Sequence, residues 1–271
     1  MKISILGCGW LGEPLAEQLV RAGHEVKGST TTPEKLVRLK AKGIDPHLIH
    51  LEPGEDVSRY VGFFESDVLF LNIPPGRRDP DVAYRFTERV RLVLGLIRSG
   101  GTKHVIFASS TSVYPDLNRV VHEEDAGGAD SASGQALFDA ERALQADNHF
   151  TTTVVRFAGL YGYDRRPGRF MAGRRDVPGG DAPVNLIHRD DAIRIVSLLM
   201  ERGVWNGVFN ACSDAHPSRR VFYTWAAREQ GFTPPTFRDE GEVPFKIVSN
   251  ERLKRSLGYE FLYPDPMQDA P

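Results

Sequence analysis

The feature that most constrains this chain is a glycine-rich hexapeptide near its start. Gly7-Cys8-Gly9-Trp10-Leu11-Gly12 follows the apolar run Lys2–Leu6 and precedes a segment, 11–22, in which leucines recur at helical spacing. A strand, a G-x-G-x-x-G turn and a helix in this order predict backbone amides that face an anion at the helix N-terminus. We therefore expect the pyrophosphate of a dinucleotide at this loop. The alternative is a glycine-rich turn without a ligand, which the flanking strand and helix make the weaker interpretation.

Strand and helix patterns alternate through the first 157 residues. Apolar or β-branched runs predict strands at 2–6, from 25, at 47–51, 68–73, 105–109 and 152–157. Helical spacing predicts a first helix at 11–22 and a later helix through Val90, Leu94 and Ile97. Between them a second helix is expected to end at Gly43, with Thr32 as its cap and Pro33 in its first turn. This alternation is typical of parallel strands joined by right-handed crossovers, and predicts an α/β fold with a Rossmann-type doubly wound parallel sheet.

The composition of the chain changes after Phe157. Residues 159–183 are rich in Gly, Arg and Pro, which indicates loops over a site. Helical patterns return at 190–200 and 221–230, with a short strand expected at 208–210 between them. We interpret 1–158 as a dinucleotide-binding Rossmann domain. Residues 159–271 are interpreted as a small C-terminal substrate lobe from which some elements return to the Rossmann core.

Charge and composition exclude several function classes. The 271 residues carry a formal charge of −2, and no basic stripe interleaved with aromatic residues indicates a nucleic-acid partner. No run approaches the roughly 20 apolar residues that a bilayer requires, and the N-terminal apolar run is too short for a signal peptide, so a cytoplasmic protein without a membrane partner is expected. Cys8 and Cys212 form no C-x-x-C pair, and no metal site is predicted.

The end of the second predicted strand bears on the choice of cofactor. Proteins that prefer NAD usually place an acidic residue there to bind the ribose hydroxyls, whereas this chain offers Ser29, Thr30 and Thr31. These hydroxyls, with Lys35 and Arg38 on the following helix, suit a 2′-phosphate, which favours NADP slightly over NAD. A solvated helix face is an equally good interpretation of the two basic residues.

Further motifs carry a resemblance that spans nearly the whole chain. Residues 107–114 (FASSTSVY) resemble the S-S-x-x-V-Y segment, 156–162 (RFAGLYG) the R-x-x-x-x-Y-G turn, and 185–191 (NLIHRDD) the I-H-x-D-D segment of extended short-chain dehydrogenases/reductases. This is the NAD-dependent epimerase/dehydratase family, which acts mainly on nucleotide sugars. The resemblance implies a seven-stranded sheet and adds Ile73, Pro74 and Ser109 to the cofactor site.

The chain departs from this family at its proton relay. The family uses Y-x-x-x-K, in which the lysine lowers the tyrosine pKa so that the phenol can move a proton. Laid on that helix, Ser133 stands in the tyrosine place and Leu137 in the lysine place, and no Tyr or Lys occurs elsewhere between Pro115 and Phe150. Ser110, which matches the family's catalytic hydroxyl, and Tyr114 are the catalytic candidates that remain; packing roles are the alternative for both.

Substrate-binding candidates come from the third quarter of the chain. Five arginines lie between 165 and 175 and suit a phosphate clamp, although a solvated loop is the commoner reason for such a set. Residues expected to touch the substrate are Tyr161, Arg169, Arg174 and His188, with packing as the alternative for Tyr161 and helix capping for His188.

Two functions remain open after these observations. One is an NAD(P)-dependent oxidoreductase or epimerase of atypical mechanism that acts on a nucleotide sugar or another phosphate-bearing small molecule. The other is a redox-silent NAD(P)-binding sensor or regulatory module; loss of the nucleotide altogether is a weaker third option. A homodimer is expected through helices that include the one at Ser133, whose apolar face is Ala136, Leu137, Ala140 and Leu144.

Overall fold

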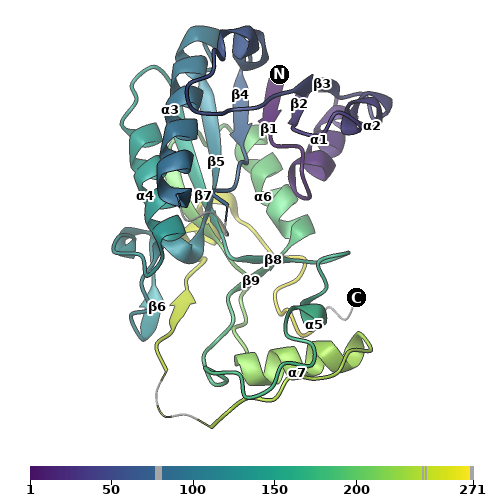
Figure 1. Ribbon diagram of the computed structural model, residues 1–271, viewed down its shortest axis with the longest axis vertical. Coiled ribbons are helices and arrows are strands. Elements are labelled where there is room, and N and C mark those ends of the chain that lie inside the picture. The colour runs from purple at the N-terminus through teal and green to yellow at the C-terminus, as the bar shows by residue number, and fades with distance from the viewer. Residues whose placement is uncertain (77–80, 240, 242, 269–271) are drawn as a thin grey trace.

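A computed structural model describes residues 1–76, 81–239, 241 and 243–268. Its centre is a seven-stranded parallel sheet in the order β10-β7-β5-β4-β1-β2-β3 (Figure 1). The strands are β1 (Lys2–Leu6), β2 (Glu25–Thr30), β3 (Asp45–Leu48), β4 (Val68–Leu71), β5 (His104–Ser110), β7 (Thr151–Phe157) and β10 (Gly207–Ala211). The predicted Rossmann-type doubly wound sheet is therefore confirmed.

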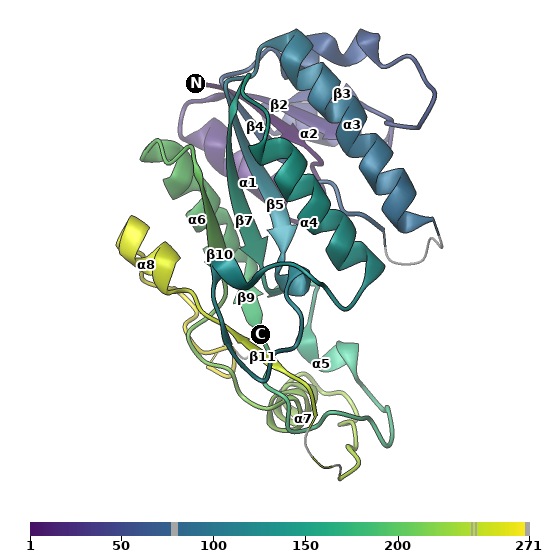
Figure 2. The ribbon, with the colours of Figure 1, turned by 90° about the vertical axis from the view of Figure 1, so that its left-hand side faces the viewer.

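Helices cover both faces of this sheet. α1 (Gly12–Arg21) and α6 (Arg189–Glu201) lie side by side on one face, where the Gln18 amide donates a hydrogen bond to Ser197. α3 (Val82–Gly100) and α4 (Ala132–Gln145) pack together on the other face (Figure 2). α2 (Lys35–Ala41) follows β2 at the β3 edge. Buried Val, Ile, Leu and Phe side chains of the strands fill the space between these layers.

Two local predictions near the β3 edge are wrong in detail. The third strand was expected at 47–51 but occupies Asp45–Leu48, because pairing with Lys27–Thr30 of β2 begins at Asp45. Thr32 does not cap α2, which begins three residues later at Lys35 and has no side-chain cap. Thr32 instead contributes its carbonyl oxygen, which accepts a hydrogen bond from the Lys35 amide.

Most of the remaining elements lie at and beyond the carboxyl edge of the sheet. Short strands form two separate pairs, β6 (Arg119–Val121) with β11 (Lys246–Val248) and β8 (Gly159–Tyr161) with β9 (Leu186–His188). The helices there are α5 (Pro167–Phe170) and α7 (Arg219–Glu229), and 3-10 turns occur at Thr111–Val113 and Glu123–Asp125. α8 (Glu251–Leu257) packs against β10, and the 3-10 turn Ser58–Phe64 precedes β4 at the opposite, amino end of the sheet. The elements beyond the carboxyl edge of the sheet are called the lobe below, and they contain a second, small hydrophobic core made of Tyr161, Val184, Leu186 and Phe222.

The apolar face expected to support a dimer is used inside the chain. Ala136, Leu137, Ala140 and Leu144 of α4 are each at most 5% exposed and belong to the main core. They offer no surface to a second copy. Among the helices that the structure describes, none has the length and apolar character required to cross a bilayer.

Candidate functional site

The glycine loop lies where the strand order reverses, at the carboxyl ends of β1 and β4, which is the usual ligand crevice of an open α/β sheet. Gly7 has a φ of +110°, and a Cβ there would stand 2.4 Å from the Asn72 carbonyl oxygen. A Cβ at Gly12 would stand 2.2 Å from the Gly7 carbonyl oxygen. Both glycines are therefore required by the protein's own packing.

Gly9 differs from its two neighbours in this loop. A Cβ built at Gly9 meets no heavy atom within 4 Å, so the protein leaves the space in front of this residue open. Leu11 is buried under the loop and precedes the first residue of α1. An open approach to backbone at the N-terminus of a ten-residue helix fits an anion, and the residues present therefore fit the pyrophosphate of a dinucleotide.

The hydroxyls at the end of β2 have different surroundings. Ser29 is 4% exposed, and its Oγ accepts a hydrogen bond from the Gly7 amide at 2.8 Å, so it holds the glycine loop rather than facing a ribose. Thr30 is also buried, and its Oγ1 accepts from the Thr32 amide at 3.1 Å. Thr31 is exposed and is the hydroxyl of this group that solvent reaches.

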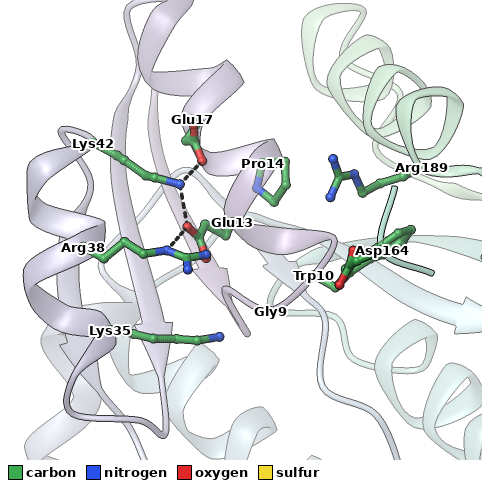
Figure 3. A pocket seen from close by; sticks show the side chains of 10 residues that line it. All are labelled: Gly9, Trp10, Glu13, Pro14, Glu17, Lys35, Arg38, Lys42, Asp164 and Arg189. Atoms are coloured by element: carbon green, nitrogen blue, oxygen red, sulfur yellow. Dashed lines mark hydrogen bonds and ion pairs between the residues drawn. The ribbon is translucent and has the colours of Figure 1, made fainter. Parts of the chain in front are cut away.

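A cavity of about 450 Å³ runs along the glycine loop and the start of α1 (Figure 3). On the α2 side of it, Glu13 is 3% exposed and accepts hydrogen bonds from Arg38 and Lys42, each at 2.6 Å. Burial raises the pKa of Glu13, but these hydrogen bonds outweigh it and leave the pKa below its ordinary value. Lys35 also lines the cavity, and its side chain forms no hydrogen bond or ion pair with any described residue.

The two serines at the end of β5 form different hydrogen bonds. Ser110 is half-buried, and its Oγ accepts the Ser112 amide at 3.2 Å, which caps the 3-10 turn that follows the strand. The predicted cofactor ligand Ser109 is 4% exposed and donates its hydroxyl hydrogen to Glu141 of α4. Half-buried Ile73 and exposed Pro74 follow β4 at the same edge of the sheet.

Tyr114, a candidate catalytic residue, belongs to a buried charge network. Its side chain is fully buried, and its hydroxyl donates to Asn210 at 2.6 Å and accepts from Arg156 at 2.7 Å. Burial raises the pKa of Tyr114 to about 12, against the opposing effect of Arg156. Arg156 in turn forms a two-pronged ion pair with Glu141, with contacts of 3.0 and 2.6 Å. The tyrosine is thus a structural residue in this structure.

The residues aligned with the proton relay lie on the first turns of α4. Ser131 caps this helix by accepting the Gly134 amide at 3.1 Å, and the hydroxyls of Ser131 and Ser133 are 3.3 Å apart. A Cβ at Gly134 would stand 2.2 Å from the Ser112 carbonyl oxygen, so this turn packs directly on the segment after Ser110. Leu137, in the place of the lysine, is 5% exposed within the apolar core.

The lobe places the four substrate candidates in two groups. Tyr161 is fully buried in the small lobe core, and His188 is 4% exposed. The His188 Nδ1 accepts the Asp190 amide at 3.2 Å, which confirms its capping role at α6. Neither side chain offers a surface to a ligand in this structure. Arg169 and Arg174 are exposed on the segment between β8 and β9.

Apart from Arg165, which belongs to the five candidate phosphate-binding arginines, the residues around Trp10 were not expected from the sequence. The Trp10 indole donates to Asp164 of the lobe, and the guanidinium carbons of Arg165 and Arg189 lie 4.2 and 5.0 Å from its ring centre. Asn72, after β4, donates to the Gly7 carbonyl oxygen at 3.0 Å. Arg189 is the variable position of the I-H-x-D-D motif, which was the available signal for it.

Comparison with known proteins gives the family. The chain is 35% identical to protein YeeZ of Escherichia coli over 271 residues, which cover 98% of this chain and 97% of that protein. The chain belongs to the YeeZ family. The family model of the coenzyme F420-dependent NADP oxidoreductases matches residues 2–83, which hold the glycine loop.

Solved structures agree with the resemblance drawn from the sequence motifs. A putative NAD-dependent epimerase/dehydratase of Methylobacillus flagellatus is 27% identical, with a TM-score of 0.75 over 98% of this chain and 95% of that one. MoeE5, solved with UDP-glucose and NAD, shares the fold at 20% identity, with a TM-score of 0.79 over 96% and 93% of the two chains. The resemblance to the epimerase/dehydratase family is confirmed, and the chain has an NAD(P)-binding, oxidoreductase/epimerase-like fold.

Proposed function

We propose that this protein binds NADP at the glycine loop and acts, as an oxidoreductase or epimerase of atypical mechanism, on a nucleotide sugar or another phosphate-bearing small molecule. The observation that carries the proposal is the open backbone at Gly9, flanked by two glycines that the fold requires for its own packing. The relative MoeE5, which was solved with UDP-glucose and NAD, supports the substrate class.

The proposed chemistry needs no protein proton relay of the usual kind. A nicotinamide supplies hydride exchange with carbon when it is bound. Ser110, half-buried at the end of β5, and Ser133 on the first turn of α4 are hydroxyls that orient a substrate oxygen by hydrogen bonding. Exposed Arg169 and Arg174 supply charge for a substrate phosphate. The proton is exchanged with water, since Tyr114 is buried and held by Arg156 and Asn210.

The preference for NADP rests on the charges beside β2. Arg38 and Lys42 are bound to Glu13, whereas Lys35 lines the cavity without such a partner among the described residues, near exposed Thr31. Replacing Lys35 with Gln should weaken NADP binding about tenfold and leave NAD binding unchanged, because only NADP carries a 2′-phosphate. Isothermal titration of both dinucleotides measures this difference, and equal losses for the two would refute the preference.

Turnover tests the proposed reaction class. Purified protein is mixed with NADP, NAD or their reduced forms and a panel of nucleotide sugars, and both nicotinamide absorbance and epimerised products are followed. A signal that Ser110→Ala lowers while dinucleotide affinity persists would support the proposal. Dinucleotide binding without any product across the panel would favour the alternative function.

That alternative is a redox-silent sensor, in which dinucleotide occupancy sets the conformation for a partner. It is favoured by Leu137, which puts a buried apolar side chain where the family's lysine would stand. The double variant Ser133→Tyr/Leu137→Lys distinguishes the two functions. If it creates turnover of a molecule that the natural protein already binds without reacting, the natural chain is silent because of these two residues.

A further inference from the structure

Arg189 has surroundings unlike those of the other buried or half-buried arginines. It is the first residue of α6, and its guanidinium carbon lies 3.6 Å from the Tyr163 ring centre and 5.0 Å from that of Trp10. Its Nε atom is buried and has no hydrogen-bond partner, and no ion pair joins the side chain to any residue that the structure describes. Buried Arg156, by contrast, is fully engaged by Glu141 and Tyr114.

The Arg189 guanidinium has donors for which the described residues supply no acceptor. A guanidinium presents five donors in one plane, and a buried donor without an acceptor costs about 1–3 kcal/mol. Asp164 lines the same cavity, and its carboxylate already accepts the Trp10 indole hydrogen. That hydrogen bond holds the pKa of Asp164 below its usual value, with a smaller contribution from the charge of Arg189.

The cavity around Arg189 has the charge and the shape for an anion. Glu13 and Glu17 are neutralised by Arg38 and Lys42 on the α2 side. Figure 3 shows Arg189 reaching toward Pro14 from the opposite side of α1, with the glycine loop between it and Lys35. The two aromatic rings fix the plane of the guanidinium, which reduces the ordering that two-pronged binding of a phosphate requires.

We propose that Arg189 is an anion-binding residue that holds phosphate oxygens of the dinucleotide pyrophosphate from the lobe side, with Trp10 and Tyr163 as its platform. This inference rests on the proposed function, because the dinucleotide is its ligand. It adds a contact from the lobe to a phosphate site otherwise made by the glycine loop. Binding would therefore join the two parts of the chain through one side chain.

The test compares Arg189→Gln with Arg194→Gln by isothermal titration with NADP and with inorganic pyrophosphate. Arg194 is the matched control: it lies on the same helix, stacks 5.2 Å from the Tyr259 ring centre and donates to the Glu260 carbonyl oxygen at 3.3 Å, but does not line the cavity. Arg189→Gln should raise the Kd for NADP roughly 10- to 100-fold and make it less sensitive to salt. Arg194→Gln should leave the Kd for NADP and its salt dependence unchanged.

A conservative variant separates binding from folding. Arg189→Lys keeps the charge and loses the planar donor pair, so it should show a smaller loss of affinity with the salt sensitivity of the natural protein. Thermal unfolding of each variant reports whether the fold is intact.

The outcomes distinguish this inference from the proposed function. If the natural protein binds NADP and a folded Arg189→Gln binds it equally well, the inference is overturned and the function stands. If the natural protein binds pyrophosphate in an Arg189-dependent manner but no dinucleotide, the anion site stands and the function fails. Binding of neither ligand would overturn both.

Discussion

Replacing Gly9 with Ala separates the stability of this protein from its proposed binding. A Cβ at Gly9 meets nothing within 4 Å, and the residue does not have a positive φ. Alanine therefore adds no clash, and it restricts the unfolded chain. We expect the free energy of unfolding to stay constant or to rise by at most about 1 kcal/mol, which shifts the melting temperature of a chain of this size by roughly 2–4 °C.

The same methyl group should abolish most of the dinucleotide affinity. It would occupy the open space through which a phosphate approaches the loop amides, where each charged hydrogen bond is worth about 1.5–3 kcal/mol. Losing one or two partly solvated bonds costs about 2–4 kcal/mol, which corresponds to a Kd roughly 30- to 1000-fold weaker. Isothermal titration with NADP and NAD measures the affinity, and thermal unfolding without ligand measures the stability.

Two comparison variants sharpen this experiment. Gly62→Ala is the matched control, because Gly62 also has open space at its Cβ position and no positive φ but lies in the 3-10 turn Ser58–Phe64 away from the loop. Gly62→Ala should change neither the free energy of unfolding nor the dinucleotide affinity by much. Gly12→Ala should destabilise the fold itself, since its Cβ would stand 2.2 Å from the Gly7 carbonyl oxygen. A folded Gly9→Ala protein that binds NADP within threefold of the natural affinity would refute an anion at this loop.

Three further perturbations test the rest of the site. Glu141→Ala should cost about 3–5 kcal/mol in urea unfolding, because it leaves the Arg156 guanidinium charged and buried, and a loss below 1 kcal/mol would contradict that account. Because the pKa of Glu13 is lowered in the folded protein, its carboxylate stabilises the fold above the ordinary pKa of 4.5, and this contribution is lost as pH falls through the lower pKa of the folded state. Between pH 7 and pH 3 the melting temperature should therefore fall less steeply in Glu13→Gln than in the natural protein. Parallel melting profiles for the two proteins would contradict this account. Tyr114→Phe should lower stability by about 1–3 kcal/mol without changing NADP affinity or any turnover, whereas loss of turnover in a stable variant would restore Tyr114 as a catalytic group.

The fold could be predicted because its signals are local. The Gly7–Gly12 loop, the apolar runs and the helical spacing each lie within a dozen residues, and they determine a doubly wound sheet without knowledge of distant contacts. The bounds of β3 and α2 were predicted wrongly because local signals alone do not determine them. The end of a strand depends on the register with its neighbour, and Asp45 pairs with Lys27 across eighteen positions of sequence that give no local sign of it.

The roles of individual site residues could not be predicted in the same way. Ser109 and Tyr114 lie in a motif that resembles a cofactor site, but their hydroxyls are directed by Glu141, Arg156 and Asn210, which follow them by 32 to 96 positions. The sequence places Arg189 in the I-H-x-D-D motif, but no local pattern tells that its side chain meets Trp10. Contacts between the lobe and the glycine loop are visible only in three dimensions.

The residues that match the family's motifs, and those that depart from them, limit the chemistry of this chain. The ion pair between Arg156 and Glu141, whose side chains are 4% and 1% exposed, anchors α4 to the sheet, so this helix holds its place beside Ser110 without the family's tyrosine and lysine. Leu137 fills the position of the lysine with apolar volume, so no ammonium group stands at this place. The chain therefore lacks the family's means of lowering a phenol pKa, whereas the proposed phosphate site has its glycines, Lys35 and Arg189. A ligand should accordingly be held mainly by its phosphates, and any hydride exchange should lack the pH dependence that a tyrosine with a lowered pKa confers.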